Sequence, residues 1–231
     1  MKNFIFVILI IGVCFPVYSQ NRFWLSTGIE SSIFTKDLEV QASFNSRFYD
    51  HGRYDKLFPE FSAKYKIVDW LDASIDYRWV FNQSRDSYER TRSHRMNFNT
   101  KPKVEFGRFK FETRFRLQYS FRRFGGATRY EPDFDNALRI KSVLKYNIDN
   151  FKVDPQIESE WYYNTNLGED GRQFVKYRFA IGVNVNLPND HELSIKYRYD
   201  YEFNIGNPGR FHILSIGHKF EIDREDYRTG L

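Results

Sequence analysis

The feature of this sequence that most constrains its fold is an alternation of apolar and polar side chains that persists for a dozen residues at a time. Across 109–121, aromatic or aliphatic residues occupy nearly every odd position, and charged or polar residues occupy every even one. The segments 38–48 and 71–81 follow the same pattern, with Val80 as an exception. Such a pattern gives a strand two distinct faces, whereas a helix would scatter the apolar residues around its circumference. The sequence therefore predicts an all-β protein with strands longer than the usual five or six residues.

The connections between these runs alternate between short and long. Short polar turns are expected at 35–37, 68–70, 107–108, 149–150 and 188–190. Longer loops, which carry Gly, Pro, Asn or Asp, are expected at 50–56, 84–91, 124–135, 164–172 and 204–210. A meander of hairpins with tight turns at one end favours a transmembrane, antiparallel, up-and-down β-barrel. We expect about 10 to 12 strands by this pattern, with short periplasmic turns and longer extracellular loops.

The strands of a soluble β-sandwich or small barrel would also alternate apolar and polar residues. The total volume of the apolar side chains decides between a soluble protein and a membrane barrel. Aromatic residues make up 19% of the chain. Roughly fifty large apolar side chains would not fit inside one barrel, because eight strands already enclose a space that side chains fill. The same side chains would cover the outside comfortably. Aromatic residues also gather at strand ends, with Trp79 and Trp161 near long loops and Trp70 at a tight turn, as in the girdles of membrane barrels.

The segment 23–34 also alternates and raises a question of strand parity. If the tight turns lie on one side, ten strands between Leu38 and Phe220 begin and end on that side. The segment 23–34 is then an eleventh strand with the wrong parity. It either closes the barrel in parallel, belongs to a twelve-stranded arrangement or folds against the lumen.

The N-terminal segment has the sequence features of a secretory signal peptide. Lys2 precedes an apolar stretch over 4–13, and cleavage is expected after Ser19, so that the mature chain begins at Gln20. A lipoprotein anchored through Cys14 is the alternative, although Val13 fits poorly before such a cysteine. We therefore expect residues 1–19 to be removed and 20–231 to form one outer-membrane barrel domain of a Gram-negative bacterium, with a polar tail from about 221.

The polar phase of the strands is assigned to the lumen and carries charges of both signs. The lumen-lining candidates are Arg78, Arg95, Arg114, Arg116, Arg122, Arg139, Glu158, Glu160, Arg178, Arg198, Asp200 and Glu202. One interpretation is an ion-pair network that fills a narrow barrel, because unpaired charges in a confined lumen are costly. The other is a basic passage that favours small anions or the anionic groups of lipopolysaccharide. The expected role is accordingly structural, or that of a narrow small-solute pore.

Signals for catalysis are weak, and we expect no enzyme, no cofactor and no metal site. His51, beside Asp50 and Asp55, is the one histidine in catalytic surroundings, and a solvated loop histidine is the simpler interpretation. No spacing typical of a metal site, a phosphate loop or a nucleophile elbow occurs. The expected partners are outer-membrane lipid and lipopolysaccharide, with the barrel-assembly machinery during insertion. Nucleic acid is not expected, because arginine and aromatic residues point to opposite faces. A barrel enzyme and a soluble periplasmic binding barrel remain as alternatives.

Several stretches resemble a known family. They are 76–82, which begins Asp-Tyr-Arg-Trp; 93–95, Ser-His-Arg; the strand 115–119; 197–204; and the closing strand 212–217. Over Trp24 to Phe220 the sequence resembles the outer-membrane barrel family catalogued as domain of unknown function 2490. The resemblance implies an outer-membrane barrel and brings no catalytic residues. One departure is that the chain continues past Phe220 to Leu231.

Overall fold

The computed structural model describes residues 20–35, 37–49, 52–83, 90–121, 136–149, 151–165 and 171–222, and these form one closed β-barrel. Its strands are β1 (Gln20–Thr35), β2 (Leu38–Phe48), β3 (Tyr54–Val68), β4 (Leu71–Gln83), β5 (Arg90–Phe106), β6 (Phe109–Phe121), β7 (Ala137–Tyr146), β8 (Val153–Asn164), β9 (Phe174–Leu187), β10 (His191–Glu202) and β11 (Arg210–Ile222). These eleven strands confirm the predicted all-β barrel and lie within the predicted range. Within the described part of the chain, no helix is long and apolar enough to cross a membrane.

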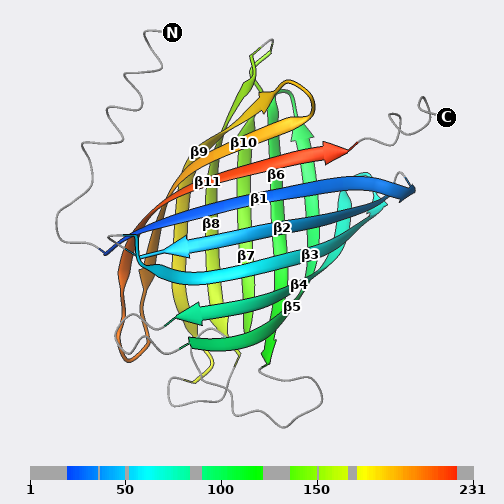
Figure 1. Ribbon diagram of the computed structural model, residues 1–231. Coiled ribbons are helices and arrows are strands. Elements are labelled where there is room, and N and C mark those ends of the chain that lie inside the picture. The colour runs from blue at the N-terminus through cyan, green and yellow to red at the C-terminus, as the bar shows by residue number, and fades with distance from the viewer. Residues whose placement is uncertain are drawn as a thin grey trace, which may run out of the picture.

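The barrel closes between its first and last strands, β1 and β11, which lie side by side in Figure 1. This pair is parallel, with a register that runs from Gln20 opposite Phe211 to Ser31 opposite Ile222. All other neighbours are antiparallel. The predicted antiparallel barrel is confirmed, and this one seam is its parallel closure. Consecutive strands alternate in direction, so the first and eleventh must run the same way, and of the three roles left open for 23–34 parallel closure is correct.

The connections have the predicted asymmetry between the two ends of the barrel. At one end, which we call the tight-turn end, two or three residues join β1 to β2, β3 to β4, β5 to β6 and β9 to β10. Asn189 and Asp190 have φ angles of 57° and 58°, the left-handed conformation that tight hairpin turns demand. The opposite end, the long-loop end, carries connections of five to fifteen residues, of which 122–136 is the longest. The short turn expected at 149–150 is wrong in length, because six residues, 147–152, join β7 to β8 at the tight-turn end. The predicted signal peptide, His51 and the tail beyond Ile222 lie outside the described residues.

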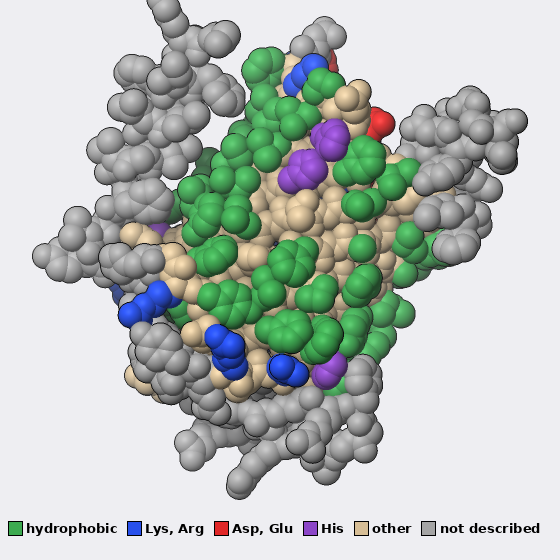
Figure 2. All heavy atoms as spheres, in the orientation of Figure 1, with side chains coloured by type: hydrophobic (Ala, Val, Ile, Leu, Met, Phe, Trp, Pro, Cys, Tyr) green, Lys and Arg blue, Asp and Glu red, His purple; other side chains and the backbone are tan. Residues whose placement is uncertain are grey.

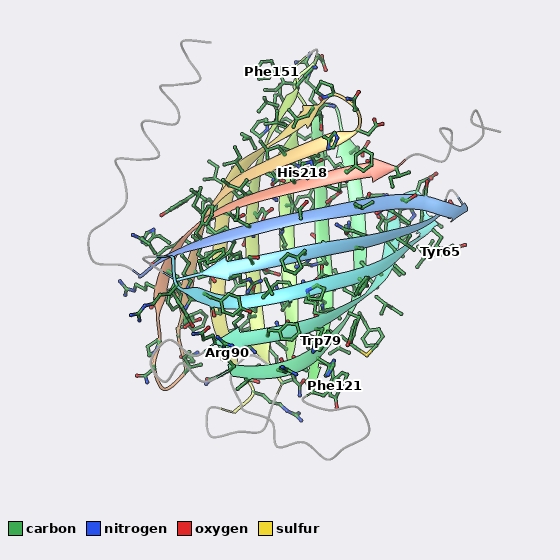
Figure 3. The ribbon with its side chains drawn as sticks, viewed as in Figure 1. Tyr65, Trp79, Arg90, Phe121, Phe151 and His218 are labelled. Atoms are coloured by element: carbon green, nitrogen blue, oxygen red, sulfur yellow. The ribbon has the colours of Figure 1, made fainter. Side chains whose placement is uncertain are left out.

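The outer face of the barrel is apolar. Strands β1 to β10 all expose large hydrophobic side chains, among them Phe61, Ile75 and Phe115, which are about half exposed. Figure 2 shows hydrophobic side chains spread over the visible outer surface. Phe121 and Phe151 lie at opposite ends of the barrel in Figure 3. The apolar phase seen in the sequence thus forms the exterior of the protein.

The inner face is mostly polar and has one apolar patch. Asp76, Glu160 and Asp200 are less than 5% exposed, although each is a carboxylate. Towards the long-loop end the interior instead holds four buried apolar residues, Phe58, Val80, Phe211 and Ile213. Val80, the exception noted in the sequence, belongs to this inward apolar patch.

The parallel seam can be tested with paired cysteines. Leu25 lies opposite Ile216 in the register, whereas Phe220 lies opposite Ile29. In a chain with Cys14→Ser, the pair Leu25→Cys and Ile216→Cys should therefore form a disulfide on oxidation, because paired strand residues lie within the roughly 4.4–6.8 Å that a disulfide spans. Leu25→Cys with Phe220→Cys is the control and should stay reduced. Non-reducing gel mobility reports the result, and cross-linking of the control pair alone would contradict the register.

Candidate functional site

The most densely paired group in the barrel interior is the carboxylate of Glu160 on β8. Arg114 and Arg139 each place a guanidinium nitrogen 2.7 Å from Glu160 Oε1, and Arg178 lies 3.4 Å from Oε2. The Tyr162 hydroxyl donates a hydrogen bond of 2.9 Å to Oε2. The side chain of Glu160 is only 3% exposed. Glu160 is therefore a hub that joins β8 to β6, β7 and β9 along the inner wall of the barrel.

Arg178 extends this network from β9 to β10. Its guanidinium forms a bidentate pair with Asp200, with donor distances of 2.5 and 2.6 Å. Lys176 lies 2.9 Å from the same carboxylate and 3.2 Å from Glu202. Charge-assisted bidentate pairs are among the strongest side-chain contacts, and Asp200 is fully buried. Two carboxylates on the strands that flank β9, Glu160 on β8 and Asp200 on β10, are thus held through one arginine.

Glu158 is the centre of a second cluster, nearer the tight-turn end. Lys141, Lys196 and Arg198 place nitrogen atoms 2.9, 2.7 and 3.4 Å from its carboxylate oxygens. The inward period of the strands explains the grouping, because β7, β8 and β10 each direct alternate residues into the lumen. Three cations therefore surround one buried carboxylate.

A third group lies on the neighbouring part of the wall, on β4 to β6. Arg116 donates to Asp76 at 2.5 Å, and Asn99 donates to the same carboxylate oxygen at 3.1 Å. Next to it, Arg78 forms an ion pair with Glu60 on β3. Arg95 donates to the Ser120 hydroxyl at 3.0 Å.

The structure places the sequence-predicted lumen residues in these three groups. Arg114, Arg139, Arg178, Glu160, Asp200 and Glu202 form one connected network. Arg198 joins Glu158 in the second group, whereas Arg78, Arg95 and Arg116 belong to the third group, on β4 to β6. Arg122 lies outside the described residues.

Two inward aromatic residues, Trp24 and Tyr162, were missed as site residues in the sequence. The Trp24 ring lies 4.1, 4.9 and 5.5 Å from the guanidinium carbons of Arg47, Arg178 and Arg198. These are cation–π distances. The signal was present, because the exposed apolar residues of β1, Leu25 and Ile29, are odd-numbered and leave Trp24 in the inward phase.

The interior holds two adjoining cavities. The first, which we call the chamber, has a volume of about 210 Å³, and Glu160 is the one acidic residue among its lining residues. Its basic lining residues are Arg47, Arg78, Arg114, Arg116, Arg139, Lys141, Arg178 and Arg198. The second, the vestibule, has a volume of about 450 Å³ and lies in the tight-turn half, lined by lysines and glutamates in similar number. Ser26, Asn45 and Lys141 line both cavities, so the two are contiguous.

The four described histidines bond to a tyrosine or to another histidine, and none belongs to the ion-pair groups above. On the outer face, His94 pairs with Tyr77 at 2.7 Å and His191 with His218 at 2.8 Å, and Figure 3 shows His218 on β11. Among the described residues, no three His, Cys, Asp or Glu side chains are grouped closely enough to hold a metal ion.

The fold and the interior define a closed barrel that is apolar outside and ionised inside, and comparison with known sequences gives its family. The chain belongs to the family described as Protein of unknown function (DUF2490), whose model matches residues 21–211. The resemblance found in the sequence is thereby confirmed, and the match assigns no activity.

Other comparisons add little. A solved structure described as "Unveiling the Mechanism Behind the in-meso Crystallization of Membrane Proteins" is 13% identical over 84% of this chain and 83% of its own, with a TM-score of 0.36. At that level of similarity we base no argument on it. No curated protein matches the sequence.

The hub role of Glu160 predicts a large loss of stability when its charge is removed. Glu160→Gln leaves Arg114, Arg139 and Arg178 without their shared carboxylate, and breaking a buried pair costs about 3–5 kcal/mol. The control is Glu105→Gln, because Glu105 is 66% exposed in its pair with Lys110, and an exposed pair contributes at most about 1 kcal/mol. Denaturant unfolding of the detergent-folded barrel measures both. Equal losses would contradict the hub.

Proposed function

We propose that this protein is an integral outer-membrane β-barrel of a Gram-negative bacterium, with a structural role or that of a narrow, nearly closed small-solute pore. The observation that carries the proposal is the distribution of side chains. Large apolar residues face outward from β1 to β10, and buried carboxylates and arginines face inward. This is the reverse of a soluble protein and the arrangement that a lipid environment favours.

The soluble alternative, a periplasmic binding barrel, fits this distribution poorly. Soluble monomers rarely expose an apolar patch larger than a few hundred Å². Here Leu25, Phe44, Phe61, Ile75 and Phe98 are all more than a third exposed on consecutive strands. A soluble barrel would bury such residues and expose its charges.

The ends of the barrel support an orientation. Trp70, Phe106 and Phe151 are exposed at the tight-turn end, and Trp79 and Trp161 are exposed near the long-loop end. Two aromatic belts are typical of a barrel that spans a bilayer. With removal of residues 1–19 and insertion by the barrel-assembly machinery, the tight turns would face the periplasm. The long loops would then meet lipopolysaccharide.

The filling of the lumen supports a nearly closed pore. Eleven strands enclose far less space than the 16 to 18 of open porins. The network around Glu160 and Asp200 crosses that space, and Phe58, Val80, Phe211 and Ile213 occupy it towards the long-loop end. Passage of solutes would require these contacts to open.

The second candidate is an enzyme on the barrel rim that acts on lipid or envelope substrates. We propose no enzymatic role, because the sequence shows no spacing typical of a nucleophile elbow, a phosphate loop or a metal site. The purified protein in detergent should therefore show no lipid deacylation and no proteolysis. Activity that is lost in His51→Ala would overturn this.

Membrane insertion has a direct biochemical test. The protein should fractionate with the outer membrane, resist extraction by carbonate or salt and migrate faster on a gel when it is not boiled, because a folded barrel stays compact in detergent. Release by carbonate, together with identical mobility before and after boiling, would contradict the proposal and favour the soluble barrel.

Conductance tests the closed lumen separately. In planar bilayers the wild-type protein should give small or no currents. The triple variant Arg114→Ala, Arg116→Ala and Arg178→Ala should conduct or unfold, since it removes the arginines that pair with Asp76 and Asp200 and two of the three that pair with Glu160. A large, steady wild-type conductance whose anion preference disappears in the variant would instead indicate an open anion channel.

A further inference from the structure

The strongest unexplained feature of the interior is the excess of positive charge around the chamber. Seven of its eight basic residues have ion-pair distances to five carboxylates, those of Glu60, Asp76, Glu158, Glu160 and Asp200. Two of these five are also shared with lysines that do not line the chamber, Lys196 and Lys176. The described residues therefore leave several positive charges in a confined space without a counter-charge.

Arg47 is the clearest case of an unneutralised cation. It forms no ion pair with any described residue, and its guanidinium instead lies 4.1 Å from the Trp24 ring and 5.0 Å from Phe58. Its cross-strand partner in the register is Trp24. A cation–π contact offsets only part of the cost of removing a guanidinium from water.

Two hydrogen-bond donors of chamber residues also lack acceptors. Arg114 Nε and Trp24 Nε1 are buried and have no hydrogen-bond partner, although Arg114 Nη2 is bound to Glu160. Buried donors are rarely left unpaired, because each carries a desolvation penalty. A negatively charged hydrogen-bond acceptor in the cavity would both pair with the free donors and compensate the excess positive charge.

The size of the chamber restricts which anion fits. About 210 Å³ corresponds to roughly seven water molecules at about 30 Å³ each. That space holds a tetrahedral oxyanion with part of its hydration and excludes a lipid or an oligosaccharide. Arginine binds phosphate and similar oxyanions through parallel N–H donors.

Access to the chamber runs from the tight-turn end. The vestibule adjoins the chamber at Ser26, Asn45 and Lys141, and Gly28 and Gly217 line the vestibule without side chains to narrow it. The other direction is occupied by the Arg178–Asp200 pair and the inward apolar patch. Among the described residues, the vestibule is thus the cavity through which an ion would approach the chamber.

We propose that the chamber is a binding site for a free tetrahedral oxyanion of the phosphate or sulfate class, which approaches through the vestibule. The anion accepts hydrogen bonds from Arg114 Nε and Trp24 Nε1 and neutralises Arg47. The inference goes beyond the proposed membrane role and depends on the barrel interior alone. Titration of detergent-folded protein therefore gives an answer whether or not the barrel resides in the outer membrane.

The test is calorimetric titration of the detergent-folded barrel with inorganic phosphate and with sulfate, at low ionic strength and with chloride as the monovalent control. One oxyanion should bind per barrel, and saturating phosphate should raise the unfolding temperature, since a ligand that binds only the folded state stabilises it. Chloride at equal ionic strength should do neither. The absence of both binding and stabilisation in the wild-type protein would overturn the proposal.

Variants localise the site. Arg47→Gln should weaken phosphate binding at least tenfold and, because it removes an unneutralised charge, should fold at least as stably as the wild type without phosphate. Trp24→Phe keeps the ring, removes the N–H donor and should weaken binding several-fold.

The matched control is Lys101→Gln, since Lys101 lines the vestibule and forms no ion pair with a described residue. It should change the affinity less than twofold. An equal loss in Lys101→Gln and Arg47→Gln would show diffuse attraction to a basic lumen and would contradict a defined site.

Discussion

The pairing of buried carboxylates with arginines and lysines is the interaction on which the rest of this barrel depends. A sheet with an apolar outer face must place its polar phase inside, where water is scarce and an isolated charge costs several kcal/mol. Glu160, Glu158 and Asp76 each solve this by pairing with basic groups from strands one or two places away in the sheet. The side chains thereby join the strands on the inner face in addition to the hydrogen bonds of the sheet.

The same pairing explains why the lumen is narrow and why it carries an excess of positive charge. Arg178 spans Glu160 and Asp200 and leaves little room for solutes, whereas Arg47 has no carboxylate among the described residues. The narrowing of the lumen and its residual positive charge thus have the same origin, the inward arginines. The first supports a narrow or structural barrel, and the second supports an anion within it.

Much of the fold followed from sequence, and the parts that did not follow have physical reasons. The alternation of apolar and polar residues predicted the strands and which side chains share a face. Asn189 and Asp190 indicated a hairpin turn. The parallel seam was not decided, because alternation describes one strand at a time and not its neighbour. Which carboxylate meets which arginine was also beyond prediction, since Arg114 and Glu160 come from β6 and β8 and their side chains meet over β7, which lies between these strands.

The central claim is that apolar residues face lipid and charged residues face the lumen, and the native tryptophans test it directly. Single-tryptophan variants that keep Trp24, Trp79 or Trp161 would be folded into vesicles with brominated acyl chains, which quench indole fluorescence on contact. Trp79 and Trp161 are exposed on the outer face, whereas Trp24 lies among inward arginines. We predict strong quenching of Trp79 and Trp161 and little of Trp24. Equal quenching of all three, or none of any, would contradict the account.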